Sequence, residues 1–105
     1  MTVLKTGRAN LLRGRESVGG KLELDGKQLR FVPHDLNVQR DQVALYITDI
    51  KQLRPAWTKF LGIVPLAPNG LDVEMRNREV WHFTVGGRKD WIREIEAVFD
   101  DTRTR

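Results

Sequence analysis

The sequence predicts a mainly β domain of about seven antiparallel strands, closed into a small barrel or sandwich by one C-terminal α-helix. Residues 21–32 and 71–85 alternate apolar and polar side chains around short turns, the period of half-buried strands. Residues 88–101 instead place apolar side chains at i, i+1, i+4, i+7 and i+8, which is one face of an amphipathic helix. A sheet of that length has to curl or split to bury its apolar face, and the helix can close an open end.

The N-terminal strands are expected over residues 8–14, 21–25 and 28–32, joined first by the flexible stretch 18–20. The second and third strands form a hairpin around Asp25-Gly26, a pair that tolerates positive φ in a tight turn. Pro33 has no amide to donate and ends the hairpin. The side chains expected to face the core are those of Leu22, Leu24, Leu29 and Phe31.

The middle of the chain is harder to assign. Residues 34–41 are polar and are expected to form a loop, whereas residues 43–48 are apolar on both faces, as in a buried strand. Residues 50–57 are assigned to a strand, although the spacing of their large apolar residues would also suit a short helix. Residues 58–70, with two prolines and two glycines, are expected to be irregular.

The C-terminal part holds the second hairpin and the helix. Residues 71–76 and 81–85 alternate around a turn at Asn77-Arg78, so that Trp81 and Phe83 face inward and His82 faces outward. Asp90 near the start of the helix favours the helix dipole. Residues 102–105 are expected to fray.

Size and composition predict one domain over residues 1–105, with its core at about 7–100 and a tail at 101–105. The chain has no cysteine, which excludes disulfides and thiolate chemistry, and it has no apolar run of the length of a membrane span or a signal. A cytoplasmic location is therefore expected.

The positive charge is uneven along the chain. Residues 1–60 hold 11 Lys/Arg against 6 Asp/Glu (+5), and residues 61–105 hold 7 against 8 (−1). The basic half suits an anionic partner, or simply a soluble surface.

The residues that usually support catalysis are missing or isolated. The single serine, Ser17, has no G-x-S-x-G context, and His34 and His82 stand 48 positions apart without clustered ligands. We therefore expect no enzyme activity, no cofactor and no metal. Outward aromatic residues interleaved with basic ones are also missing, so a nucleic-acid partner is not expected.

The chain resembles the GRAM domain family, which has the pleckstrin-homology superfold. The matching features run from about Gly7 to Phe99: Gly19-Gly20-Lys21-Leu22, Leu29 and Phe31 before Pro33-His34, Asn37, Asp49-Ile50, Pro68-Asn69-Gly70-Leu71, Phe83, and Arg88 with Trp91-Ile92. Family members often place a threonine and a polar residue where this chain has Asp25-Gly26, which changes the turn and not the fold. The resemblance implies two near-orthogonal sheets capped by the helix. It also implies a non-catalytic binding module for phosphoinositides, membranes or proteins.

If that superfold is correct, the loops after the first, third and sixth strands gather at one open end. The basic residues expected there as a weak anion or lipid site are Arg13, Arg15, Lys21, Arg40, Arg76 and Arg78. Arginine pairs with phosphate through a planar fork, although Glu16 reduces the positive charge of the first loop. The alternative is a set of solvated arginines beside turns. His34 also has two interpretations, as hydrogen-bonding architecture of its loop or as the rim of the anion site.

The most apolar irregular segment, residues 60–66 (FLGIVPL), is a candidate partner contact through Phe60, Leu61, Ile63, Val64 and Leu66. It would equally serve as core over the end of the barrel, or as a membrane wedge. The sequence thus predicts a cytoplasmic binding module that makes weak, peripheral contact with anionic lipid headgroups. The alternative is a protein-interaction or self-associating module that uses residues 60–66 or an edge strand.

Overall fold

The computed structural model describes the chain except for residues 1, 15, 36–41, 61–63 and 104–105, and it describes residues 57–60 and 64–68 by their backbone alone. Seven strands precede one helix: β1 (Val3–Arg13), β2 (Glu16–Asp25), β3 (Gln28–Pro33), β4 (Val43–Tyr46), β5 (Ile50–Phe60), β6 (Val64–Met75), β7 (Val80–Val85) and α1 (Arg88–Arg103). A short 3-10 helix, η2 (Ile47–Asp49), joins β4 to β5.

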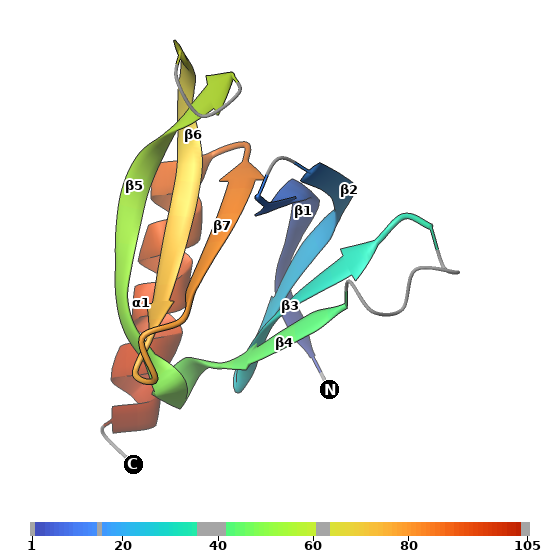
Figure 1. Cartoon of the computed structure of the whole chain (residues 1–105). Helices are drawn as coiled ribbons and strands as arrows, with labels where there is room; N and C mark the ends of the chain where they lie inside the picture. The colour runs from blue at the N-terminus through green and yellow to red at the C-terminus, as the bar shows by residue number, and fades with distance from the viewer. Residues whose placement is uncertain (1, 15, 36–41, 61–63, 104–105) are drawn as a thin grey trace.

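All strand pairs are antiparallel, and the strand order is β4-β3-β2-β1-β7-β6-β5. The sheet is strongly bent at the β1–β7 junction, so that β2–β4 splay away from β5–β7, and α1 runs alongside β5–β7 (Figure 1). β4 and β5 are the two edges of the sheet. The predicted fold class, seven antiparallel strands closed by a C-terminal helix, is confirmed.

The core lies inside the bend and is built from the alternate residues that the sequence pattern places inward. Phe31 of β3 and Phe83 of β7 meet with ring centroids 6.0 Å apart, which joins the two halves of the sheet. The helix adds Trp91, Ile95 and Val98 to the same core. Each of these five side chains is buried.

Two glycines allow close approach between neighbouring strands. A Cβ atom at Gly20 would lie 2.3 Å from the carbonyl oxygen of Val32, and one at Gly70 would lie 2.8 Å from that of Ala56. Both distances are shorter than any real contact, so only glycine fits at these points.

Several predicted boundaries are wrong. β1 begins at Val3 instead of residue 8, β2 at Glu16 instead of Lys21, and α1 continues to Arg103, past the predicted tail boundary. The predicted strand over 43–48 ends at Tyr46, where η2 turns the chain.

The largest error concerns residues 58–70, because the described parts, 58–60 and 64–70, are strands and not irregular. β5 is a strand, as predicted over the helical alternative, and it continues to Phe60 before β6 returns from Val64. Register shifts between Ala56 and Lys59 interrupt the pairing of the two strands there. Such bulges allow a strand to contain the prolines from which the sequence predicted a loop.

Candidate functional site

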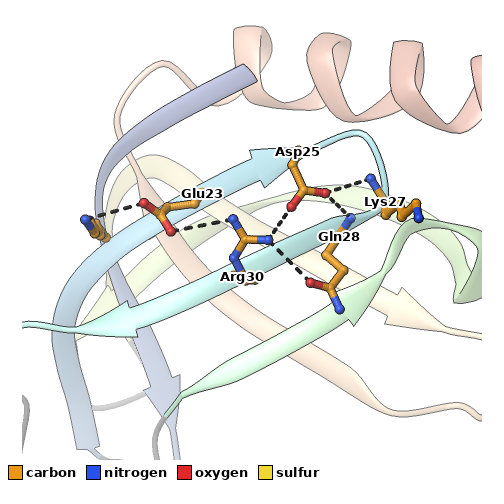
Figure 2. Close-up of polar contacts among 6 residues, drawn as sticks. Glu23, Asp25, Lys27, Gln28 and Arg30 are labelled. Atoms are coloured by element: carbon orange, nitrogen blue, oxygen red, sulfur yellow. Dashed lines mark hydrogen bonds and ion pairs between the residues drawn. The ribbon is translucent and has the colours of Figure 1, made fainter. Parts of the chain in front are cut away.

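A polar network on β2 and β3 starts from Asp25 at the end of β2 (Figure 2). Its side chain is 1% exposed, and one carboxylate oxygen accepts hydrogen bonds from the amides of Lys27 (2.7 Å) and Gln28 (2.8 Å). The other oxygen accepts from the Arg30 guanidinium, which also lies 3.7 Å from Glu23. Burial alone would raise the pKa of Asp25, but the hydrogen bonds from Arg30 and the two amides outweigh it and lower the pKa below 3.8.

This network corrects one expectation about the turn. Neither Asp25 nor Gly26 adopts a positive φ. The carboxylate of Asp25 holds the turn instead, by accepting from two successive amides. Asp25 and Arg30 therefore serve the architecture of the hairpin, and Glu23 links them to Lys21, whose Nζ lies 3.4 Å from the Glu23 carboxylate.

Lys21 also belongs to an exposed pair of basic residues on β1 and β2. It lies opposite Arg8 of β1, and both side chains are exposed on the outer face of the sheet. Cross-strand partners have Cβ atoms about 5 Å apart, close enough for both cations to contact one anion. Lys21 shares Glu23 with Arg30, whereas Arg8 has no ion-pair partner among the residues that the structure describes.

The adjacent row of the same face contains Asn10, Gly19 and His34. Asn10 lies opposite Gly19, and the amide of His34 donates to the Gly19 carbonyl oxygen at 3.0 Å. A Cβ atom at Gly19 would lie 3.5 Å from Asn10 Oδ1 and 3.6 Å from His34 Cδ2. The amide and imidazole side chains therefore converge over a residue that has no side chain. Arg8 and Lys21 stand about 7 Å along the strands, one row away.

We call Arg8, Asn10, Lys21 and His34 around Gly19 the outer-face cluster. All four side chains are exposed, and those of Asn10 and His34 have no hydrogen-bond partner in the described part of the chain. The cluster offers amide, imidazole, ammonium and guanidinium groups, the set that recognises a phosphate or carboxylate. The sequence identified Lys21 and His34 as candidates but missed Arg8, Asn10 and Gly19. Only the register of β1 against β2 brings these three together.

The other predicted arginines that the structure describes do not join this cluster. Arg13 ends β1 opposite Glu16 and has the strand parity of the buried Leu11, so it does not share the face of Arg8. Arg76 donates from Nε to the Thr48 carbonyl oxygen at 3.1 Å in the region of η2. Arg15 and Arg40 lie outside the described residues.

Arg76 and Arg78 do not join the end of β1. They form the β6–β7 turn, which is drawn at the lower end of the molecule beside η2, whereas β1 ends in the upper half of the view (Figure 1). Arg78 has a φ of 77°, in the left-handed region that is unusual for an arginine. The single basic end expected from the sequence is thus divided between separate parts of the fold.

The described parts of the predicted apolar contact segment are the end of β5 at Phe60 and the start of β6 at Val64, and these strands project above the rest of the sheet (Figure 1). Leu61 and Ile63 lie outside the described residues, and so do the side chains of Phe60, Val64 and Leu66. A partner contact through this segment stays a prediction.

The second histidine is placed as the sequence predicted. His82 is exposed on the outer face of β7, where its Nδ1 lies 2.8 Å from Asp72 Oδ1 on β6. Within the described ranges, no three His, Cys, Asp or Glu side chains are grouped so as to hold a metal ion. The same ranges contain no helix that is long and apolar enough to cross a bilayer.

Comparison with known proteins finds a likeness in fold alone. No protein-family model and no curated protein matches the sequence, so the GRAM resemblance stays an expectation. The C-terminal domain of an unknown protein from Leishmania infantum matches with a TM-score of 0.77 at 14% identity, over 93% of this chain and 84% of that one. The human ARAP2 N-terminal PH domain matches with a TM-score of 0.69 at 16% identity, over 93% and 80%.

A further match is the Slm1-PH domain, solved in complex with phosphoserine (TM-score 0.68, 11% identity, 93% of this chain and 96% of that one). The same domain, solved with inositol-4-phosphate, matches with a TM-score of 0.64. At these identities the likeness concerns architecture. The chain has the fold of the PH domains.

Proposed function

We propose that this chain is a non-catalytic PH-like module that binds a phosphate-bearing anion through the outer-face cluster. The observation that carries the proposal is the convergence of Asn10 and His34 over Gly19, one row from the Arg8–Lys21 pair. Asn10 Oδ1 is the atom of that side chain nearest Gly19, so the amide would rotate to present Nδ2. A phosphate over this row would then accept from Asn10 Nδ2 and a His34 ring N–H while it contacts Arg8 and Lys21.

Charge and fold support the same proposal. Arg8 is not neutralised by an acid in the described structure, and the N-terminal 60 residues have a surplus of five positive charges. The Slm1-PH domain, which shares the fold, has been solved with two phosphate-bearing ligands. Its identity to this chain is only 11%, so the fold makes a phosphate ligand a reasonable hypothesis and the residues of this chain have to provide the site.

The test is co-sedimentation with liposomes that contain phosphatidylcholine alone or with phosphatidylinositol phosphate or phosphatidylserine, at low and high salt. Each Lys or Arg near an anionic surface contributes about 1 kcal/mol, so Arg8→Ala/Lys21→Ala should weaken binding about thirtyfold. High salt should weaken the wild type as well.

The matched control is Arg76→Ala/Arg78→Ala, which removes the same charge from the β6–β7 turn and should change binding little. Titration with soluble inositol-4-phosphate distinguishes the two sources of phosphate. Binding of the soluble compound without liposome binding would identify a free phosphate ligand. Equal losses in the two double variants, or no binding in either arm, would refute the outer-face cluster as the site.

A further inference from the structure

The structure contains a groove of about 440 Å³ between β5 and α1, remote in sequence from the outer-face cluster. Its apolar lining consists of the buried Ile50 and Ile95 and the partly buried Leu53 and Phe99. The helix side of its rim carries Glu96 and Asp100. The groove therefore combines an apolar lining with an acidic rim.

The strand side of the groove is an unpaired edge. β5 is the last strand in the sheet order, so its backbone groups that point away from β6 have no strand partner within the described structure (Figure 1). Pro55 has no amide to donate to a further strand. The available edge is thus limited to about Ile50–Arg54.

The charges of the groove are unevenly neutralised. On β5, Lys51 Nζ lies 3.7 Å and Arg54 Nη2 lies 3.4 Å from the Glu74 carboxylate. Gln52 donates to the same carboxylate at 2.7 Å, so these three side chains share Glu74 on the β6 side. On the helix, Glu96 and Asp100 are exposed and have no ion-pair partner among the described residues. A basic occupant would therefore gain two unshared carboxylates.

We propose that this groove binds an extended peptide segment of the pattern basic-x-basic, which adds to the edge of β5 as a further strand. Residues two apart on a strand are separated by about 7 Å and face the same side. Glu96 and Asp100, four apart on α1, are separated by about 6 Å along the helix. The spacing of same-side residues on the peptide strand therefore matches the spacing of Glu96 and Asp100 on the helix. Two arginines of the peptide can each reach one carboxylate.

The apolar part of the groove suits the same occupant. Lysine and arginine cover apolar surface with their aliphatic stems while their charged ends stay in water. Phe99 already receives a guanidinium of this kind, because Arg103 lies 5.6 Å from the centroid of its ring. Backbone pairing with an exposed sheet edge would supply affinity, and the paired carboxylates would supply the preference for basic residues.

The experiment is an NMR titration of the full chain with a capped hexapeptide in which one threonine separates two arginines. Amide shifts should change in residues 50–54 and 95–100. Glu96→Lys should weaken binding about tenfold. Glu94→Lys, which makes the same charge change on the helix outside the groove lining, should have a much smaller effect.

Peptides that are N-methylated on alternate amides test the strand geometry, because a paired strand presents only alternate N–H groups to its neighbour. One of the two methylated forms should lose binding and the other should keep it. The proposal is overturned if both forms bind like the unmodified peptide, if Glu94→Lys and Glu96→Lys weaken binding equally, or if millimolar peptide shifts nothing. A concentration-dependent shift of the same amides without peptide would assign the groove to a second copy of the chain and would also overturn it.

Discussion

Asp25 is the buried acid on which the β2–β3 turn depends. Asp25→Asn keeps the shape of the side chain but replaces the charge that faces Arg30, so we expect a loss of about 2–3 kcal/mol in the free energy of unfolding at neutral pH. Because the folded-state pKa of Asp25 is lowered, its contribution is present above pH 3.8 and is lost as the pH falls through the folded value. In urea unfolding, the difference in the free energy of unfolding between the wild type and Asp25→Asn should shrink as the pH falls. A constant gap would contradict this account, and exposed Asp49→Asn is the control.

Gly20 gives the sharpest test of packing at a single position. Gly20→Ala would place a Cβ atom against the Val32 carbonyl oxygen and the Phe31 ring, so we expect a loss of about 3 kcal/mol or more. Gly26→Ala, at a glycine with nothing within 4 Å of the added Cβ, should change stability by less than about 1 kcal/mol. Thermal unfolding of the two variants would decide, and similar melting temperatures would show that β2 and β3 are farther apart than described here.

Arg88 joins α1 to the β5–β6 hairpin, since its Nη1 donates to the carbonyl oxygens of Ala56 (2.6 Å) and Gly70 (3.3 Å). Arg88→Gln should cost about 2 kcal/mol because these carbonyls lose a charged donor. Hydrogen exchange should accelerate at the start of α1 and in the adjoining part of β5. The control is Lys89→Gln at the exposed neighbouring residue, which should leave hydrogen exchange unchanged. Equal exchange in both variants would mean that the packing of Trp91, Ile95 and Val98 holds the helix without Arg88.

The strands and the helix also show what the sequence could predict. Both hairpins and α1 followed from hydrophobic period, because each buries one face against the core. The strands over residues 58–60 and 64–70 could not be predicted from this period. Their prolines predict a loop, and only bulges between the two paired strands allow prolines within a strand. The candidate site was predicted only in part. Lys21 and His34 were identified, but Arg8, Asn10 and Gly19 depend on the pairing register of β1 with β2, which the featureless stretch Val18-Gly19-Gly20 does not specify.

Taken as a whole, the fold separates two charged regions. The outer face of β1–β3 carries Arg8 and Lys21, whereas α1 carries Glu96 and Asp100 at the groove, which have no ion-pair partner among the described residues. An anionic membrane would attract the first region and repel the second, so the bound protein should present its β1–β3 face to the lipid. Spin labels at Thr6 and at Glu94 should differ in accessibility to a membrane-bound relaxation agent, with the label at Thr6 the closer to the bilayer. The reverse order would contradict this orientation.

The central claim is that a phosphate is bound by the outer-face cluster. The most direct measurement is an NMR titration of the full chain with inositol-4-phosphate, followed through the backbone amides and the side-chain amide of Asn10. The account predicts saturable shifts confined to Arg8–Asn10, Gly19–Lys21 and His34, which disappear in Arg8→Ala/Lys21→Ala. Shifts centred on the β6–β7 turn or on the end of β1, or no shifts at all, would contradict it.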